Sequence, residues 1–230
     1  MDKNKEKLNI LKNLMDEATT VIFDFDNIIA DSEPFHFKAY QRVFMDEEHT
    51  LDRDEYWEEW TFKGGGAEGE IRRHDLPLDP DYIRSRKDPI YSGYCRSGEI
   101  EIFPESLEII KTLYRKDYTL AVASGSYSRD ILSIIDHRGM RKYFSTVIGK
   151  DMVKNRKPDP ETYLKAAEEL GVKPARCLVI EDAVKGIISA HRAGMKAVGV
   201  RTEVTEGLDL SSADLVTGSL GELYTLIKSV

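Results

Sequence analysis

Cysteine is scarce in this chain, and so are long apolar runs. Only two cysteines, Cys95 and Cys177, occur in 230 residues, and no Cys-x-x-Cys pair suggests a zinc site or a disulfide framework. Cys177 opens an apolar run, so we expect it to be a small buried hydrophobe. No apolar run approaches the roughly 18 to 20 residues that span a bilayer, and the N-terminus lacks the apolar stretch of a secretory signal. We therefore expect a cytoplasmic protein with no membrane partner.

An excess of basic charge is also absent. The formal net charge is -8, from 33 Lys and Arg against 41 Asp and Glu, which argues against a nucleic-acid partner because phosphate backbones are bound mainly through Lys and Arg. Basic clusters occur at residues 72–74 and 84–87, and we interpret both as solvated helix faces. One or two of their residues could still hold a small anionic ligand.

Short apolar runs alternate with helical patterns over most of the chain. Residues 21–23, 120–123, 146–148, 178–180 and 197–200 have the pattern of buried strands, with a possible sixth strand at 213–216. Helices are predicted at 104–116, 160–170 and 183–193, punctuated by Pro104, Pro160, Gly171 and Gly194. Near-continuous apolar strands separated by helices indicate a parallel sheet covered on both faces. The predicted fold class is a doubly wound α/β domain.

One interval breaks this alternation. Roughly a hundred residues separate the first two strands, whereas a single crossover needs a few tens, and this interval has helical patterns and both tryptophans. We predict an α/β core at 1–35 and 103–230, with a helical cap inserted at 36–102. An amphipathic N-terminal helix, with Leu8, Leu11 and Leu14 on one face, is expected to pack on the core, although it could instead meet a partner.

Polar residues follow the predicted strands where each one ends. Ligands of open α/β sheets bind beyond the carboxyl ends of the strands, so these residues are the candidate site. Taken singly, each has a structural interpretation: Asp-x-Asp as a turn, Ser126 as a helix cap, Lys157 as a surface lysine, and Glu181-Asp182 as acids at a helix N-terminus. Their recurrence at one sheet edge indicates chemistry instead. The candidates are Asp24, Asp26, Ser124, Gly125, Lys157, Glu181 and Asp182.

Together these residues resemble the haloacid dehalogenase-like superfamily, specifically its β-phosphoglucomutase-like phosphatase branch. The first motif is Asp24-Phe25-Asp26 with Asp31-Ser32 following, and the second is Ser124. The third is Lys157-Pro158-Asp159-Pro160, and the fourth is Glu181-Asp182. The resemblance covers about residues 20–200. Asn27 replaces the commoner glycine, which is tolerable because Asn can adopt left-handed turn conformations.

The resemblance implies a phosphoryl-transfer mechanism that depends on Mg²⁺. Asp24 would attack phosphorus and form an aspartyl-phosphate, and Asp26 would protonate the leaving group and then activate the acceptor. Lys157 would neutralise charge, and Ser124 with backbone N–H groups near Gly125 would bind the phosphoryl oxygens. The implied metal ligands are the Asp24 carboxylate, the Asp26 carbonyl and Asp182. Glu181 would either bind the metal directly or orient one of these ligands.

The inserted cap is expected to select the substrate, a small phosphorylated metabolite. His36 and Lys63 are the candidate substrate contacts, although each could equally be an ordinary residue of a helix turn or loop. β-Phosphoglucomutases carry an arginine where this chain has Ala67, and the nearest arginines are Arg72 and Arg73. We therefore favour a phosphatase over a mutase.

Other activities fit the sequence less well. A phosphonate hydrolase would need a Schiff-base lysine in the cap, for which Lys38 and Lys63 show no specific match. A non-catalytic binding module would be expected to lack Asp24 or Asp182, and both are present. The expected assembly is a monomer or a weak homodimer.

Overall fold

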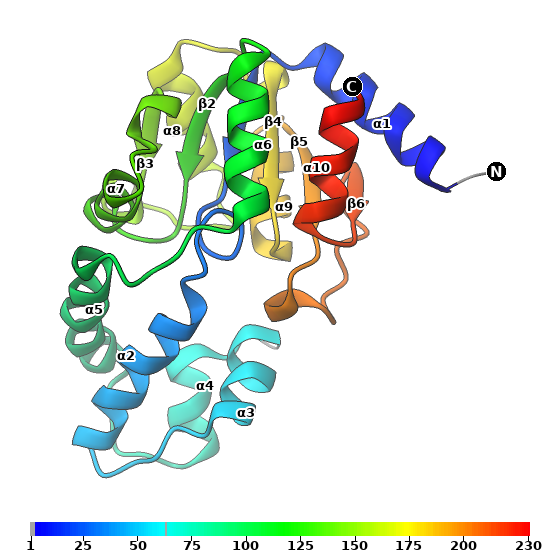
Figure 1. Ribbon diagram of the computed structural model, residues 1–230. Coiled ribbons are helices and arrows are strands. Elements are labelled where there is room, and N and C mark those ends of the chain that lie inside the picture. The colour runs from blue at the N-terminus through cyan, green and yellow to red at the C-terminus, as the bar shows by residue number, and fades with distance from the viewer. Residues whose placement is uncertain (1–2, 63) are drawn as a thin grey trace.

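A computed structural model describes residues 3–62 and 64–230 of the chain. It has a layered α/β part and a group of helices that lies beyond one edge of the sheet (Figure 1). The N-terminal and C-terminal helices run close to each other at the opposite end of the α/β part (Figure 1).

The central sheet has six parallel strands in the order β3-β2-β1-β4-β5-β6. This confirms the predicted doubly wound α/β fold and its possible sixth strand. The order reverses at β1, so the carboxyl ends of β1, β2 and β4 lie side by side, where such sheets bind ligands. The strands are β1 (Thr20–Phe23), β2 (Thr119–Ala123), β3 (Thr146–Ile148), β4 (Cys177–Glu181), β5 (Lys196–Val200) and β6 (Leu215–Thr217).

Helices cover both faces of the sheet, because alternate strand residues point to opposite sides. Val21 and Phe23 of β1 belong to one buried cluster, and Ile22 between them belongs to another. The first cluster is covered by α1 (Lys3–Glu17), α6 (Pro104–Arg115), α7 (Ser128–His137) and α10 (Leu220–Ser229). The second is covered by α8 (Glu161–Leu170) and α9 (Val184–Arg192).

The N-terminal helix packs on this core, as predicted. Leu11, Leu14 and Met15 of α1 are buried in the first cluster, and α1 contacts α10 and β6. Cys177 is buried, which confirms its prediction as a small hydrophobe, and Cys95 is buried and free as well. Within the described residues, no helix combines the length and apolarity needed to cross a membrane.

The inserted segment forms a helical module, which we define as α2 to α5, residues 33–97. Its elements are α2 (Glu33–Asp46), α3 (Arg53–Glu55), a π-helix (Tyr56–Phe62), α4 (Gly66–Arg73) and α5 (Pro80–Ser97). The module has a hydrophobic cluster of its own, centred on Phe44, Tyr56 and Trp60. Both tryptophans of the interval, Trp57 and Trp60, lie in the π-helix.

Two chain segments join the module to the α/β part. They pair with each other, through an antiparallel bridge between Ala30 and Ile102 and through hydrogen bonds from Asp31 N to Glu101 O and from Phe103 N to Ile29 O. These two paired segments hold the module over the carboxyl ends of the strands. The division at residues 35/36 and 102/103 stays a prediction.

Candidate active site

The sheet edge brings the predicted polar residues together. Asp24 follows β1, Ser124 follows β2, Glu181 ends β4 and Asp182 comes next. All four are buried. Three of them, Asp24, Glu181 and Asp182, line the sheet side of a cavity of about 770 Å³, and Tyr40, Lys87 and Tyr91 line its module side. The site thus lies between the two parts of the molecule.

Lys157 is the centre of this arrangement rather than a surface lysine. Its Nζ donates to Asp24 Oδ1 at 2.6 Å, Glu181 Oε1 at 2.8 Å, Tyr163 Oη at 2.8 Å and the carbonyl of Ala123 at 3.0 Å. Its side chain is 6% exposed. Although burial alone would lower the pKa of Lys157, Asp24 and Glu181 raise it well above its usual value. The ammonium is therefore charged and fixed against the proposed nucleophile.

The three acids carry more negative charge than Lys157 neutralises. Oxygen atoms of Asp24, Glu181 and Asp182 lie within 4.8 Å of one another, so the group can hold a metal ion. Burial raises the pKa of Asp24 to about 7, which Lys157 opposes and Glu181 reinforces. Burial and then the neighbouring carboxylates also raise the pKa of Asp182 well above its usual value. Three carboxylates beside one ammonium leave an excess of two charges, which a divalent cation would neutralise.

Glu181 is saturated by protein donors. Oε1 accepts from Lys157 and from Tyr163 Oη at 3.0 Å, and Oε2 accepts from the backbone N–H groups of Asp182 and Ala183 at 3.0 Å. Gly186 in α9 makes room for it, since a Cβ there would lie 1.6 Å from Glu181 Oε1. Because both of its oxygens accept from protein donors, Glu181 is suited to holding Lys157 and Asp182 in position.

Asp26 is held by three serine hydroxyl groups from two segments of the chain. Ser32 Oγ donates to Oδ1 at 2.6 Å, while Ser126 Oγ at 2.7 Å and Ser124 Oγ at 3.2 Å donate to Oδ2. Burial would raise the pKa of Asp26, but His36, Ser32 and Ser126 stabilise the carboxylate and hold that pKa well below its usual range. Ser126 thus serves Asp26 directly, whereas the residue that caps α7 is Tyr127. The helix-cap interpretation of Ser126 was wrong.

His36 lies beside Asp26. Its Nε2 is 3.6 Å from Asp26 Oδ1, and its ring stacks on Tyr91 with centroids 3.8 Å apart. His36 also lines the cavity, as does Gly125. Lys63, the other predicted substrate contact, falls outside the described residues. Asn27 has a φ of 60°, which confirms the left-handed turn expected where relatives have glycine.

Sequence reasoning missed Lys87 and Tyr163. Lys87 was placed on a solvated helix face, but it is 5% exposed and lines the cavity, with Nζ 4.4 Å from the Tyr91 ring centre and 5.2 Å from that of Tyr40. The spacing of Lys87 and Tyr91, four apart on one helix, was the available signal. Tyr163 gave no such signal, because an ordinary core aromatic of a helix, with no role in a site, has the same sequence pattern.

Comparison with known proteins places the chain in a family. Residues 21–200 match the model of the haloacid dehalogenase-like hydrolase family, and relatives above 30% identity cover more than two thirds of the chain. The chain belongs to the haloacid dehalogenase-like hydrolase family, as its four motifs predicted.

Its relatives include named phosphatases. The chain is similar to the fructose-1-phosphate phosphatase YqaB of Escherichia coli, with 33% identity over 79% of this chain and 95% of that protein. It is also similar to a phosphorylated carbohydrates phosphatase of Thermotoga maritima, with 31% identity over 85% of this chain and 91% of that protein. Both matches support the prediction of a phosphoric monoester hydrolase.

Solved structures share the fold. The structure of CbbY from Rhodobacter sphaeroides in complex with phosphate has a TM-score of 0.75 and 27% identity, over 90% of this chain and 96% of that one. A putative β-phosphoglucomutase from Thermotoga maritima has a TM-score of 0.71 and 27% identity, over 92% of this chain and 99% of that one. About a tenth of this chain or less falls outside either match, so most of the helical module lies within both.

Proposed function

We propose that this protein is a magnesium-dependent phosphatase of small phosphorylated sugars that forms an aspartyl-phosphate on Asp24. The observation that carries the proposal is the buried contact of 2.6 Å between Lys157 Nζ and Asp24 Oδ1, beside the acids Glu181 and Asp182. A buried carboxylate next to a fixed ammonium can approach an anionic phosphate, because the positive charge offsets the repulsion between the two anions. The named sugar-phosphate phosphatases among the relatives support the substrate class.

The donor set fits Mg²⁺. All three side chains of the acidic group offer carboxylate oxygens, which Mg²⁺ prefers, whereas zinc sites usually include histidine or cysteine. Asp24 and Asp182 would hold the ion, and Glu181, whose oxygens are taken by four donors, would hold Lys157 and Asp182 in place. When bound, Mg²⁺ supplies positive charge that offsets the repulsion between the phosphate and the carboxylates.

In the proposed reaction a carboxylate oxygen of Asp24 attacks phosphorus, and the bond from phosphorus to the sugar oxygen breaks. The sugar oxygen leaves with the electron pair and takes a proton from Asp26. Asp26 then removes a proton from water as the water oxygen attacks the same phosphorus, which releases inorganic phosphate and restores Asp24. Lys157 stays protonated throughout and compensates charge on the phosphoryl oxygens.

The hydroxyl cage of Asp26 sets a condition on this scheme. A carboxyl group whose pKa is held well below its usual range carries no proton near neutral pH. Asp26 must therefore leave Ser124, Ser126 and Ser32 and take up a proton before it can protonate the sugar oxygen. Ser124 Oγ and Ser126 Oγ would then be free to donate to the phosphoryl oxygens. We infer that substrate binding exchanges these hydroxyls from Asp26 to the phosphate.

The module supplies a cation on the opposite wall of the cavity. Burying a lysine costs free energy unless its charge is paired, and burial lowers the pKa of Lys87 to about 8. Lys87 Nζ lies over the rings of Tyr40 and Tyr91, and it is 3.8 Å from Asp88 Oδ1. We propose that Lys87 binds the sugar part of the substrate or a second anionic group on it.

The geometry gives less support to a mutase. Ala67 is buried at 2% exposure, and Arg73, one of the two candidate clamps, binds Glu55 and Glu70. Among the described residues, the cavity lining includes Arg84 and Arg156 but neither Arg72 nor Arg73. Lys38, considered for phosphonate hydrolysis, is exposed and outside that lining. The cytoplasmic location and a monomer or weak homodimer stay predictions.

Release of inorganic phosphate tests the proposal. A panel of sugar phosphates that includes fructose 1-phosphate and β-glucose 1-phosphate should yield phosphate with Mg²⁺ and none with a chelator or with Asp24→Asn. With β-glucose 1-phosphate, phosphate should appear faster than glucose 6-phosphate. Stimulation by glucose 1,6-bisphosphate with little phosphate released would establish the mutase instead.

A further inference from the structure

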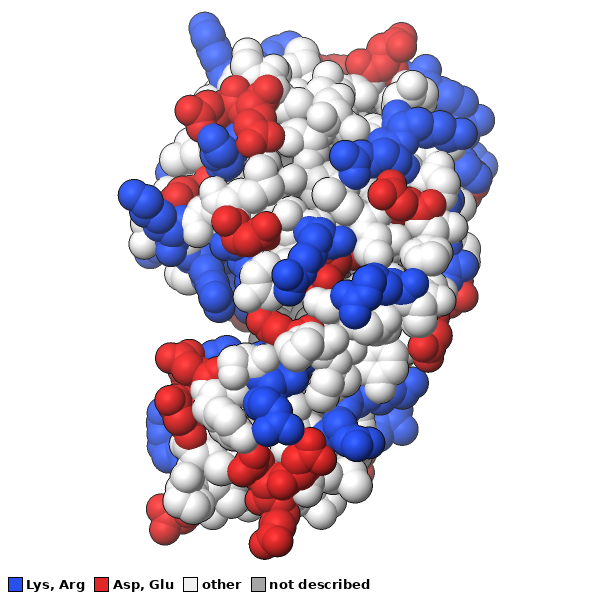
Figure 2. All heavy atoms as spheres, turned by 90° about the vertical axis from the view of Figure 1, so that its left-hand side faces the viewer, with Lys and Arg blue, Asp and Glu red and all other residues white. Residues whose placement is uncertain are grey.

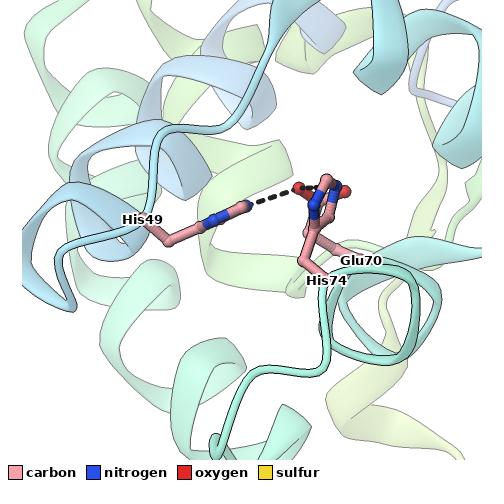
Figure 3. A group of neighbouring side chains, drawn as sticks. All are labelled: His49, Glu70 and His74. Atoms are coloured by element: carbon pink, nitrogen blue, oxygen red, sulfur yellow. Dashed lines mark hydrogen bonds and ion pairs between the residues drawn. The ribbon is translucent and has the colours of Figure 1, made fainter.

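A second group of metal-ligating side chains lies in the helical module, outside the cavity. His49, Glu70 and His74 offer ligand atoms that lie within 4.8 Å of one another. His49 comes from the loop between α2 and α3, Glu70 from α4, and His74 from the end of α4. Figure 3 shows both imidazole rings directed at the Glu70 carboxylate.

Both rings lie near the same carboxylate oxygen. His49 Nε2 is 2.7 Å and His74 Nε2 is 3.6 Å from Glu70 Oε1. His74 Nε2 has a nearer partner in Glu55 Oε1, at 2.9 Å, so its ring must leave Glu55 to join Glu70 on one ion. Ligand atoms of a tetrahedral zinc ion, at 2.0 to 2.2 Å from the metal, are about 3.3 Å apart. The two distances bracket that separation, so small side-chain rotations would place the three atoms around one ion.

The other oxygen of Glu70 is fixed by separate donors. Trp60 Nε1 donates to Oε2 at 3.1 Å, and Arg73 Nη2 donates to it at 2.5 Å. Metal-binding carboxylates are commonly oriented by such outer hydrogen bonds. The Glu70 side chain is fully buried, and the His49 ring packs against Phe44 with centroids 5.4 Å apart. The carboxylate therefore presents one defined oxygen to the two histidines.

Arg73 does not occupy the candidate site. Its guanidinium contacts Glu55 Oε1 at 2.8 Å and Glu59 Oε2 at 3.6 Å, and it lies on the Oε2 side of Glu70. The oxygen near both histidines, Oε1, is therefore open to a divalent ion on the side away from Arg73.

We propose that His49, Glu70 and His74 form a binding site for Zn²⁺ or a similar transition-metal ion, with water in the remaining position. Each histidine binds through Nε2, so any proton that Nε2 shares with Glu70 is released when the metal enters. The ion ties the α2–α3 loop to α4. It also acts next to Trp60, which both holds Glu70 and lines the substrate cavity.

A hydrogen-bonded network of the same residues is the alternative, and Zn²⁺ titration separates the two. Tag-free protein is stripped with chelator and titrated with Zn²⁺ by calorimetry under excess Mg²⁺, which occupies the core acids. We expect one Zn²⁺ per chain with a dissociation constant of about 10 μM or below. His49→Gln and His74→Gln should each weaken it at least about tenfold.

Two control variants locate the binding. His191→Gln removes a histidine of matching exposure, 36% against 37% for His74, that pairs with Asp214 at 2.9 Å. Asp182→Asn disables the core acids. Both should keep the wild-type Zn²⁺ affinity, and Zn²⁺ should raise the unfolding temperature of both but not of the His49 or His74 variants. The proposal fails if wild type binds no Zn²⁺, if the double histidine variant binds as well as wild type, or if only Asp182→Asn loses binding.

Discussion

Lys157 shows how a single residue organises the site. Its ammonium has four oxygen partners, two of them carboxylates, within 3.0 Å. A lysine has only three donor hydrogens, so the four contacts share three hydrogens. The positive charge of the ammonium therefore contributes most of the attraction. Removing Lys157 would leave two buried carboxylates without their cation, a loss that typically costs about 3–5 kcal/mol. The residue therefore holds the fold of the site as well as its chemistry.

Asp24 should make the metal-free fold less stable as pH rises. Its pKa rises on folding from 3.8 to about 7, so between those pH values the folded state keeps a proton that the unfolded state has lost. Stability then falls across this window, by about 4 kcal/mol at most. Asp24→Asn removes the effect. In chelator at pH 8 the variant should unfold at a higher temperature than wild type, and the two should converge toward pH 5.

Thermal unfolding between pH 5 and 8 measures this difference. Asn at exposed Asp54 is the matched control and should leave the wild-type pH dependence unchanged. Mg²⁺ at pH 8 should narrow the gap by stabilising wild type. An Asp24→Asn protein that unfolds below wild type at pH 8 in chelator would show that Asp24 contributes stability rather than costing it.

At the scale of an element, α9 approaches β4 so closely that only glycine fits at Gly186. Alanine there would drive its Cβ into the Glu181 carboxylate, which holds Lys157. Gly186→Ala should lower the unfolding temperature and reduce kcat at least about tenfold, although Gly→Ala inside a helix alone stabilises by about 0.5–1 kcal/mol. Gly93→Ala in α5 is the control, since nothing lies within 4 Å of its Cβ. Equal behaviour of the two variants would refute the packing account.

Helix α5 brings Lys87 to the wall of the cavity. Lys87→Met keeps the apolar stem and removes the charge, so we expect KM for the best sugar phosphate to rise about tenfold or more with a smaller change in kcat. Because the Lys87 pKa is about 8, the wild-type KM should also rise above that pH, and the variant's should not. Lys142→Met is the control, an exposed lysine that also lies over a tyrosine ring, at 5.2 Å from that of Tyr143. Unchanged KM in Lys87→Met would remove Lys87 from the substrate site.

At the scale of the molecule, the sequence predicted the sheet because its strands are near-continuous apolar runs with acids at their ends. Asp24, Ser124, Glu181 and Asp182 could be placed at one edge from strand order alone. Lys87 was missed although its spacing from Tyr91 on α5 was a signal. The His49–Glu70–His74 group could not be placed, because a loop whose path no periodicity describes brings His49 to α4. Tyr163 was hidden for another reason, since a core aromatic with a polar tip gives no distinct pattern.

Charge is distributed more evenly on the surface than in the interior. On the face shown in Figure 2, basic and acidic side chains are interspersed, as expected for a net charge of -8 spread over 74 charged residues, 33 basic and 41 acidic. The less even charge is inside, where three carboxylates, Asp24, Glu181 and Asp182, lie together and Lys157 pairs with two of them. An interior charge of this kind favours a small ion and a small anionic substrate over a large charged partner.

Trapping the phosphorylated residue tests the central claim most directly. In Asp26→Ala, a substrate with a good leaving group such as p-nitrophenyl phosphate needs no proton donor for the first step, but hydrolysis of the intermediate lacks its base. An aspartyl-phosphate should therefore accumulate. After an acid quench and borohydride reduction, peptide mass spectrometry should find homoserine at position 24, and none without Mg²⁺. Phosphate release with Asp24 unmodified, or with the phosphoryl group on another residue, would contradict the account.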